Sequence, residues 1–410
     1  MLIPREEYLN RLIALKDKQI IKVVTGVRRC GKSKLLELYQ QWLLAQGVEE
    51  DQIISINFED LDFEALTDYR ELHAYLKARL AKGKMTYIFL DEIQNVAEFP
   101  KVVDSLYLKD HIDLYITGSN AHMLSSEIAT LISGRYMQIE MLPLSFKEYM
   151  ISTGDTNDRG TKYLDYLQNS SFPYTLELKD QPDEIRNYLE GLYNTIVIKD
   201  IMNRKKITDP NMLKSILKFV FDSIGSPLSS KKIADTMTSA GRKIDARTVE
   251  KYLAALTESY IVYQAKRYSI KGKQHLKTLE KYYVVDIGLR LMLIGSRQPD
   301  AGHILENIVY LELLRRGYDV YVGKVDEFEV DFVAQNSKGT KYFQVALSVR
   351  DEKTLARELI ASASAKALDK CFLMVRTSFL LFTLVSAEGE SRVTPVSRRF
   401  CRRSGGRGRR

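Results

Sequence analysis

A short run of residues near the start of the chain has the types and spacing that hold a polyphosphate. Residues 26–33 read Gly-Val-Arg-Arg-Cys-Gly-Lys-Ser and fill every fixed position of the pattern G-x-x-x-x-G-K-[ST]. In this pattern the glycines let backbone N–H groups point at the phosphates, the lysine reaches the β- and γ-oxygens, and the hydroxyl binds Mg²⁺. We therefore predict a nucleoside triphosphate site, with Ser33 as a metal ligand, formed by Gly26, Val27, Arg28, Arg29, Cys30, Gly31, Lys32, Ser33 and Lys34.

The segments on either side of this run are those that a phosphate loop requires. An apolar run over residues 20–24 predicts a buried strand in front of it, and residues 34–44 read as a helix behind it. The positive end of that helix dipole would face the bound anion. Strand, loop and helix thus follow in the required order; the alternative is a chance match in a glycine-containing turn.

Paired carboxylates, Asp91 and Glu92, lie at the end of an apolar run over residues 87–93. Acids at the end of a buried strand are costly unless a metal ion or a water uses them. We therefore predict that Asp91 binds Mg²⁺ through its water shell and that Glu92 polarises the attacking water; the alternative is an acidic helix cap. The strand expected at residues 113–117 leads to Asn120, either a water-orienting side chain or an ordinary turn residue.

These segments, followed by Ser-Gly-Arg-Tyr at residues 133–136, succeed one another as they do in a known family. The chain up to about residue 200 resembles the prokaryotic AAA-type ATPases related to the STAND and archaeal ATPase groups. The resemblance implies ATP and Mg²⁺ as ligands and ATP hydrolysis with Lys32 and Glu92 in catalytic roles. It also implies that Arg135 is a γ-phosphate sensor or arginine finger, in its own or a neighbouring subunit; the alternative is a solvent-facing or ion-paired arginine.

A second resemblance begins at about residue 215, where the chain is similar to DUF4143, the domain of unknown function that usually follows this ATPase in bacteria and archaea. Between the two, residues 193–204 predict a junction helix. Its members Asp200 and Arg204 have the i, i+4 spacing of an ordinary exposed helix pair. We assign neither of them a catalytic role.

Residues 225–290 have the pattern of a small winged-helix unit. Ser229 and Asp245 each predict a helix start, and the second of these helices is the candidate recognition helix. Strands at residues 261–265 and 282–286 would form the wing around a lysine-rich stretch. Such a wing contacts DNA phosphates, contacts a protein partner or is simply solvated, and the sequence leaves these alternatives open.

Four further polar residues lie on consecutive expected elements. Glu306 lies on a helix, Glu329 and Asp331 lie on the following strand, and Gln344 lies on the next strand. This layout resembles the PD-(D/E)xK nuclease fold, in which carboxylates bind Mg²⁺ and a lysine positions the attacking water. The position of that lysine is taken here by Ala346, and hydrolysis without the cation loses electrostatic support. We therefore expect an inactive nuclease-like domain, with an active nuclease as the alternative.

The net charge of +8 comes from the end of the chain. Residues 391–410 hold eight arginines and no lysine, aspartate or glutamate, so the first 390 residues are neutral overall. This tail has almost no apolar residues, and we expect it to be disordered. It is either a nucleic-acid-binding tail or the product of a frame shift or truncation after Cys371, which resequencing of the gene would decide.

Length and composition favour a protein of two or three domains. The 410 residues are 45% hydrophobic without an uninterrupted run of 18 apolar residues or a charged-then-apolar leader, so we expect a cytoplasmic protein that does not enter a membrane. Cys30, Cys371 and Cys401 are too few and too scattered for a disulfide framework or a metal cluster. Cys30 is either a filler residue or an oxidation-sensitive thiol.

The predicted fold class is therefore α/β, in five parts. A P-loop AAA-like ATPase domain with a parallel sheet and helices spans residues 1–160, and a helical junction spans 161–224. A winged-helix-like unit at 225–290, a restriction-endonuclease-like α/β domain at 291–390 and the tail follow.

The predicted function is ATP binding and hydrolysis that control the C-terminal winged-helix and nuclease-like module. One alternative is an ATP-controlled protein that binds or cleaves DNA. Another is a nucleotide-gated scaffold that binds protein partners and hydrolyses ATP slowly. A homo-oligomer or a separate protein partner remains open in each case.

Overall fold

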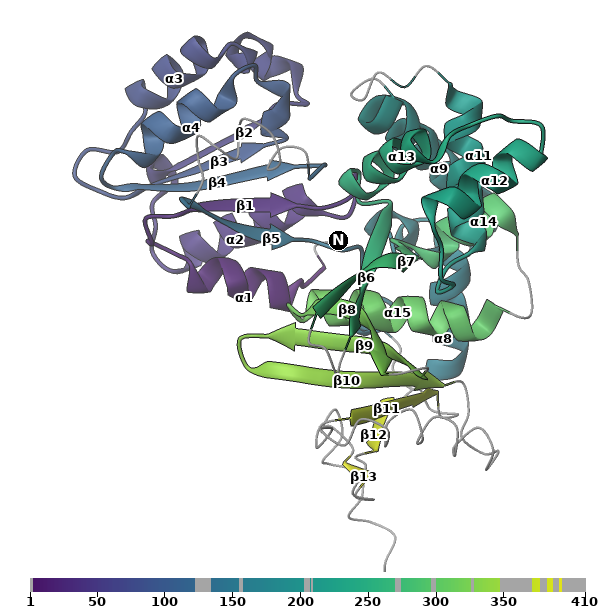
Figure 1. The fold of residues 1–410 in the computed structure, drawn as a ribbon. Coiled ribbons are helices and arrows are strands. Elements are labelled where there is room, and N and C mark those ends of the chain that lie inside the picture. Colours follow the sequence, from purple (N-terminus) through teal and green to yellow (C-terminus); the bar gives the residue numbers. More distant parts are fainter. Residues whose placement is uncertain are drawn as a thin grey trace, which may run out of the picture.

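The structure is a computed structural model, and it describes residues 3–121, 134–154, 158–202, 207, 209–269, 274–295, 300–325, 328–346, 371–376, 382–385 and 391–392. Arg204, Cys401 and the arginine-rich tail beyond residue 392 lie outside the described residues. Figure 1 shows an N-terminal sheet between helices, in purple and blue, beside a mixed C-terminal part in teal and green.

A parallel sheet forms the centre of the N-terminal part. Its strands in the described chain are β1 (Ile21–Thr25), β2 (Ile53–Asn57), β3 (Thr86–Asp91), β4 (Ile112–Gly118) and β5 (Tyr136–Glu140), in the order β2-β3-β4-β1-β5. The register places Thr25 opposite both Gly118 and Glu140, and Asn57 opposite Asp91. Because the strands are parallel, all their carboxyl ends meet at one edge, where the phosphate loop follows β1.

Side chains alternate between the two faces of this sheet. Each face is covered by helices, which are α1 (Glu6–Ala14), α2 (Lys32–Ala45), α3 (Tyr69–Ala78) and α4 (Phe99–Tyr107). Phe89 and Tyr115 pack toward α1 and α2, whereas Ile88 and Ile116 pack toward α3 and α4. Figure 1 shows the two helix pairs on opposite sides of the sheet. The short helices η1 (Glu50–Gln52), η2 (Leu61–Thr67) and η3 (Ile93–Asn95) lie in the connections.

A helical segment joins the two parts of the chain. It consists of α7 (Phe146–Ser152), α8 (Arg159–Asn169), η4 (Pro173–Leu176), α9 (Pro182–Thr195) and the π-helix η5 (Ile196–Met202). The helix expected at residues 193–204 is therefore divided, since α9 ends where the π-helix begins. A π-helical stretch is rare, and such stretches frequently lie at functional sites.

The C-terminal part contains helices α11 (Pro210–Asp222), α12 (Ser230–Ser239), α13 (Ala246–Glu258), α14 (Ile287–Ile294) and α15 (Ala301–Arg315). Its strands are β6 (Val262–Ser269), β7 (Gln274–Val284), β8 (Asp319–Val325), β9 (Phe328–Asn336), β10 (Gly339–Ala346), β11 (Cys371–Arg376), β12 (Phe382–Val385) and β13 (Ser391–Arg392). The expected caps are present: Ser229 accepts a hydrogen bond from Lys232 N–H, and Asp245 accepts one from Thr248 N–H.

The expected wing strands pair as predicted but do not stand alone. β6 and β7 are antiparallel, with Val262 opposite Val284, and an isolated bridge joins Leu228 to Glu280. β6 also pairs in parallel with β8, so in the described part of the chain one sheet runs in the order β13-β12-β11-β10-β9-β8-β6-β7. The domain boundary expected near residue 290 lies on α14, between the strands β7 and β8, which belong to the same sheet. Helix α15 packs on that sheet.

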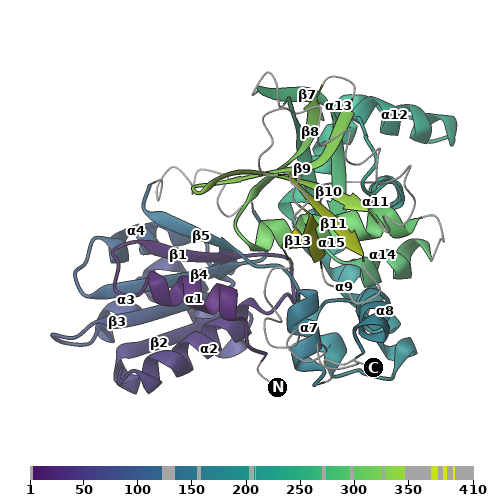
Figure 2. The same ribbon diagram turned by 90° about the horizontal axis from the view of Figure 1, so that it is seen from below.

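The two parts share a hydrophobic core. One continuous set of buried apolar residues runs from α1 and α2 through the joining helices to α15 and the C-terminal sheet. Figure 2, seen from below, shows α7, α8 and α9 between the N-terminal sheet and the C-terminal strands. No helix among the described residues is long and apolar enough to span a bilayer.

Candidate functional site

The loop between β1 and α2 needs glycine at both fixed positions. Gly26 has φ +148° and Gly31 has φ +103°. A Cβ atom on Gly26 would lie 2.1 Å from the carbonyl oxygen of Met141, a contact that no side chain can make. The turn therefore takes the shape that its sequence predicts, and α2 begins directly behind it at Lys32.

Lys32 is buried at the centre of the loop. Its ammonium group donates to the carbonyl oxygens of Gly26 at 3.2 Å and Val27 at 3.4 Å, and lies 3.3 Å from Glu92 Oε1. Burial lowers the pKa of Lys32, but the carboxylates of Glu92 and Asp91 outweigh that effect and raise it. Lys32 is therefore a fixed positive charge in the loop.

Asp91 and Ser33 offer oxygen ligands side by side. The Thr117 hydroxyl donates to the Asp91 carboxylate. Burial raises the pKa of Asp91, and the nearby Ser33 hydroxyl opposes that effect without cancelling it. One carboxylate and one hydroxyl suit Mg²⁺, which takes few protein ligands and completes its octahedron with phosphate and water oxygens. The described part of the chain holds no group of three or more His, Cys, Asp or Glu side chains placed for a metal ion. Asp91 and Ser33 would therefore hold the ion jointly with a bound polyphosphate.

Glu92 lies beside Asp91 in a constrained position. Its backbone has φ +53°, its N–H donates to Thr117 Oγ1 at 2.9 Å, and Gln94 donates to its second carboxylate oxygen. Burial raises the pKa of Glu92, but Lys32 and then Gln94 outweigh it, so that the pKa is lowered. Glu92 is an ionised carboxylate whose two oxygens are held by different partners.

The end of β4 completes this edge. Ser119 and Asn120 are both buried there. Ser119 Oγ and Gln94 Oε1 are buried atoms without a hydrogen-bond partner among the described residues. Ala121 N–H donates to the carbonyl oxygen of Glu258 at 2.8 Å, which connects the end of β4 to the end of α13. Asn120 thus lies on the same edge as Asp91 and Glu92, next to a contact with the C-terminal part.

Arg135 lies at the opposite edge of the sheet. Its carbonyl oxygen accepts the N–H of Ile21, the first residue of β1, whereas the phosphate loop follows the last residue of β1. Four strand steps separate these ends by about 13 Å. The Arg135 guanidinium pairs with Asp104 and lies 5.3 Å from the centre of the Tyr107 ring. This position favours a neighbouring subunit over the nucleotide of the same subunit, and both roles of Arg135 stay predictions.

The remaining residues of the phosphate loop differ in how far their side chains are buried. Cys30 is fully buried, and burial raises the pKa of its thiol, which disfavours the reactive thiolate and supports the filler alternative. Val27 is also buried, whereas Arg29 is exposed with φ +66°. Lys34 pairs on the helix surface with Glu37, at 2.7 Å.

Arg28 makes a contact that sequence reasoning missed. Its guanidinium donates to both Asp200 oxygens at 3.0 Å and to Glu59 Oε1 at 2.7 Å. Asp200 is buried on the π-helix η5, which corrects its expected exposure, and Arg204 lies outside the described residues. Nothing in the sequence signals this contact, because the two residues are 172 positions apart.

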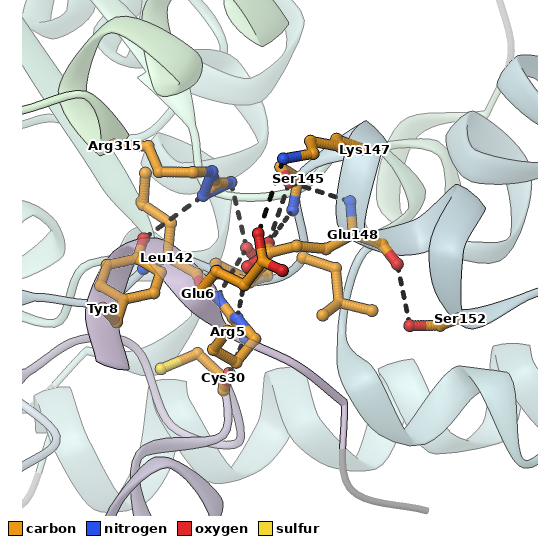
Figure 3. A network of polar contacts seen from close by, with 12 residues as sticks. Arg5, Glu6, Tyr8, Cys30, Leu142, Ser145, Lys147, Glu148, Ser152 and Arg315 are labelled. Atoms are coloured by element: carbon orange, nitrogen blue, oxygen red, sulfur yellow. Dashed lines mark hydrogen bonds and ion pairs between the residues drawn. The ribbon is translucent and has the colours of Figure 1, made fainter. Parts of the chain in front are cut away.

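Arg5 supports the loop from behind (Figure 3). Its buried guanidinium donates to the carbonyl oxygens of Cys30 at 3.1 Å and Leu142 at 2.6 Å, and to Glu148 Oε1 at 2.8 Å. The N–H and hydroxyl of Ser145 hold the other Glu148 oxygen at 2.7 and 2.9 Å. The spacing Ser145-x-x-Glu148 is a capping-box signal, which predicts the start of α7 but not Arg5 as a partner.

The same network reaches the C-terminal part (Figure 3). Arg315, at the end of α15, donates to the carbonyl oxygen of Pro143 at 3.1 Å and to the Tyr8 hydroxyl at 3.3 Å. That hydroxyl also accepts the N–H of Leu142 at 3.1 Å. Because α15 carries Glu306 as well, one helix connects the loop network to the polar residues of the C-terminal sheet.

The four polar residues predicted on the C-terminal sheet do come together. Gln344 Oε1 accepts Asp331 N–H at 3.3 Å. Lys281 of β7 lies between Glu306 and Glu329, with its ammonium 3.0 Å from Glu306 and 2.7 Å from Glu329. Burial lowers the pKa of Lys281, but these carboxylates outweigh it and raise it.

The carboxylates of this cluster are already engaged. The Tyr283 hydroxyl donates to Glu306 Oε1 at 2.5 Å, and Arg267 lies 3.7 Å from Glu329 Oε2. Asp331 accepts the N–H of Val345 at 2.8 Å. The arrangement is that of an ion-pair network, and the inactive nuclease-like domain stays a prediction.

Comparison with protein families identifies the class. The family model described as "AAA domain" matches residues 18–150, so the N-terminal part is an AAA domain with a P-loop. A "Domain of unknown function (DUF8612)" matches residues 160–300. The expected DUF4143 is therefore corrected to DUF8612, whose match includes the joining helices.

Two relatives define the family more closely. The chain is 40% identical over 352 residues to an "Uncharacterized protein" of Haemophilus influenzae, covering 85% of this chain and 88% of the relative. It is 30% identical over 349 residues to "Uncharacterized protein MJ1544" of Methanocaldococcus jannaschii, covering 80% of this chain and 75% of the relative. The chain belongs to the family of these two proteins.

Solved structures give more distant likenesses. The Walker-type ATPase PABY2304 of Pyrococcus abyssi is 15% identical with a TM-score of 0.44, covering 71% of this chain and 95% of that one. The Aeropyrum pernix ORC1 protein in complex with DNA is 14% identical with a TM-score of 0.32, covering 72% and 92%. AMPPCP-bound DnaA from Aquifex aeolicus is 14% identical with a TM-score of 0.31, covering 62% and 88%. Likeness at this level does not indicate what this chain binds.

Proposed function

We propose that the protein binds ATP with Mg²⁺ in the loop before α2 and hydrolyses the γ-phosphate. The observation that carries the proposal is the meeting of Lys32, Asp91 and Glu92 at the carboxyl edge of a parallel sheet, with Lys32 Nζ 3.3 Å from Glu92 Oε1. These are the positive charge, the metal ligand and the water-orienting carboxylate that phosphoryl transfer needs.

Each residue has a separate task in this proposal. Lys32 moves from Glu92 to the β- and γ-oxygens, where it gathers the charge that develops during transfer. Ser33 and Asp91 hold Mg²⁺, which neutralises charge on the same oxygens. Glu92, no longer paired with Lys32, has a higher pKa and accepts a hydrogen bond from the attacking water. Asn120 orients that water from the neighbouring strand end.

Arg135 acts, in this proposal, on the nucleotide of a neighbouring subunit. Its guanidinium lies at the amino edge of the sheet, and 39% of the side chain is exposed. Among the carboxylates of the described residues, Asp104 is the one that pairs with it. Mixing Arg135→Ala subunits with Lys32→Ala subunits should restore hydrolysis if each variant is itself inactive. Absence of restoration in verified mixed oligomers would remove this role.

The nucleotide state controls the C-terminal part in this proposal. Two hydrogen bonds between the N-terminal and C-terminal parts support this control. Ala121 N–H donates to the carbonyl oxygen of Glu258 at the end of α13, and Arg315 of α15 donates to the carbonyl oxygen of Pro143 behind the loop. Helices α11, α12 and α13 followed by the antiparallel pair β6 and β7, with the bridge at Leu228, have the order of a winged helix. We retain residues 1–160 as the ATPase domain and 161–224 as the junction, followed by this unit.

DNA binding is the alternative with an observation of its own. Exposed basic side chains on or beside α12 and α13 are Lys231, Lys232, Arg242, Lys243, Arg247 and Lys251. They stand among the exposed acids Asp235, Asp245 and Glu250, so the surface is only moderately positive. We propose no DNA cleavage, because Lys281 and Arg267 engage the carboxylates of the C-terminal cluster.

The test is release of phosphate from ATP by the full-length protein with Mg²⁺, with EDTA, and with duplex DNA. We expect turnover that EDTA abolishes. Stimulation by DNA favours the DNA-directed alternative, and turnover indifferent to DNA favours a protein partner. No turnover above the EDTA control would contradict hydrolysis and leave the scaffold alternative, and Mg²⁺-dependent cleavage of the added DNA would contradict an inactive C-terminal cluster.

A further inference from the structure

Arg28 is the third residue of the phosphate loop, and it is committed to partners outside that loop. It is buried, and its donors Nε and Nη2 bind the two oxygens of Asp200 at 3.0 Å each. Nη1 donates to Glu59 at 2.7 Å, in the segment that follows β2. A bidentate arginine–carboxylate pair is strong and fixes the orientation of both groups.

Asp200 belongs to the segment through which the chain leaves the AAA domain. It lies in the π-helix η5, between α9 and α11, and is itself buried. π-Helical stretches are rare and are frequently found at functional sites. The bidentate pair therefore holds an irregular segment of the joining region against the phosphate loop.

Arg28 also lies close to the reacting end of the site. Lys32 Nζ lies 3.4 Å from the carbonyl oxygen of Val27, the residue directly before Arg28, and 3.3 Å from Glu92 Oε1. Glu92 is the carboxylate that the proposed function places beside the γ-phosphate. A bound triphosphate therefore brings a second anion within the range of the Arg28 guanidinium.

Because an unpaired buried charge is costly, a buried arginine gives up its carboxylate partner only when another anion takes that partner's place. Removing one partner of a buried pair leaves an uncompensated charge, whereas two oxygens of a phosphate can accept the same pair of guanidinium N–H groups that a carboxylate accepts. Exchange from Asp200 to a γ-phosphate keeps Arg28 paired. The exchange removes the bidentate pair that ties Asp200, and with it the π-helix, to the phosphate loop.

We propose that Arg28 transmits occupancy of the phosphate loop to the joining segment by exchanging Asp200 for the γ-phosphate. Asp200 is then a positioning residue, and η5 loosens when ATP binds and tightens after the γ-phosphate leaves. This inference rests on the proposed function, since it requires a triphosphate in the loop. It adds which residue reports the γ-phosphate and which segment responds.

The experiment is hydrogen–deuterium exchange of the full-length protein, followed at peptides that cover residues 196–202. Samples contain Mg²⁺ with ATPγS, with ADP or with no nucleotide, and binding of each is measured in parallel by calorimetry. We expect exchange in this segment to be at least about fivefold faster with ATPγS than with ADP, as for a typical coupling between sites. The γ-phosphate is the only difference between those two samples.

Two variants separate the exchange of partners from a general loosening. Asp200→Asn should exchange fast in residues 196–202 under all conditions, lose the difference between ATPγS and ADP, and bind ATPγS more tightly than the wild type. Glu59→Gln is the matched control, because it removes a carboxylate from the same guanidinium but not from η5. It should retain the nucleotide-dependent difference.

The outcomes distinguish this inference from the proposed function. Wild-type protein that binds ATPγS without a faster exchange in residues 196–202 overturns the inference alone. The same holds if Asp200→Asn keeps the full nucleotide response. Wild-type protein that binds neither nucleotide overturns ATP binding and this inference with it. Arg28→Lys covers the case in which Asp200→Asn fails to fold: it keeps the charge, loses the bidentate pair and should lose the response.

Discussion

Lys32 and Lys281, two of the buried lysines in the described part of the chain, both lie next to carboxylates, but their surroundings differ. Lys32 and Lys281 are each 4% exposed and each contact a glutamate, Glu92 or Glu306. Lys32 stands in a glycine turn at the end of parallel strands, beside buried polar atoms without a partner among the described residues. Lys281 stands within the sheet, and the Tyr283 hydroxyl engages the same glutamate.

This difference shows why residue types alone do not identify a site. An ammonium group between carboxylates is a structural ion pair unless another ligand can replace one partner. The phosphate loop provides that option through backbone donors and strained glycines, which serve no purpose in a purely structural pair. At the Lys281 cluster Glu306 and Glu329 are already paired with Lys281, although Arg267 Nε and His303 Nδ1 are buried there without a hydrogen-bond partner among the described residues.

The largest effect on stability is expected at the C-terminal cluster. Lys281→Met leaves Glu306 buried without its cation and should lower the free energy of unfolding by about 3 to 5 kcal/mol. Urea denaturation measures this, with Lys84→Met as control, since Lys84 and Glu49 form an exposed pair. A stable Lys281→Met protein that had lost a Mg²⁺-dependent DNA cleavage would contradict the structural role.

The next effect is on ligand binding at the loop. Lys32→Ala should weaken binding of ATP at least about 100-fold, which corresponds to roughly 2.7 kcal/mol. The reason is that the only buried ammonium of the described loop residues is removed from the phosphate position. Calorimetry measures the affinity. Equal weakening by Lys281→Ala, which lies outside the loop, would mean that the loss is indirect.

A smaller effect is expected behind the loop. Arg5→Ala leaves Glu148 and the Cys30 carbonyl without their shared donor and should lower the free energy of unfolding by about 2 kcal/mol, with weaker ATP binding. Arg11→Ala is the control, because Arg11 is exposed and donates only to Gln138 among the described residues. If both variants unfold at the same urea concentration, Arg5 does not support the loop.

The smallest effect has the opposite sign. Burial raises the pKa of Asp91, so its ionised form is disfavoured in the folded protein, and stability is lost as the pH rises from the unfolded value of 3.8 through the raised folded value. Asp91→Asn should therefore be slightly more stable than the wild type at pH 7 and no more stable below pH 3.8, while losing Mg²⁺-dependent hydrolysis. A variant less stable at pH 7 would show that Asp91 is held as a structural acid.

The sequence predicted the features that depend on local spacing. The loop over residues 26–33, the acids after β3 and the caps at Ser229 and Asp245 are each set by residues within a few positions of one another. The position of Arg135 at the amino edge was not predictable, because it follows from the pairing of β5 with β1.

Contacts between distant residues account for the rest. Arg28 with Asp200 and Lys281 with Glu329 join elements whose proximity depends on how the helices and the C-terminal sheet pack. The expected wing was found as a strand pair, but its continuation into the sheet required the parallel pairing of β6 with β8. Periodicity along the chain carries no information about such pairings.

The measurement that tests the central claim most directly is single-turnover hydrolysis of ATP by Glu92→Gln, with ATP binding measured in the same preparation. Glu92 is proposed to act on the attacking water and not on the bound nucleotide. We predict an affinity close to that of the wild type and a hydrolysis rate at least about 100-fold lower. Hydrolysis at the wild-type rate would contradict the assignment of Glu92, and with it the proposed site.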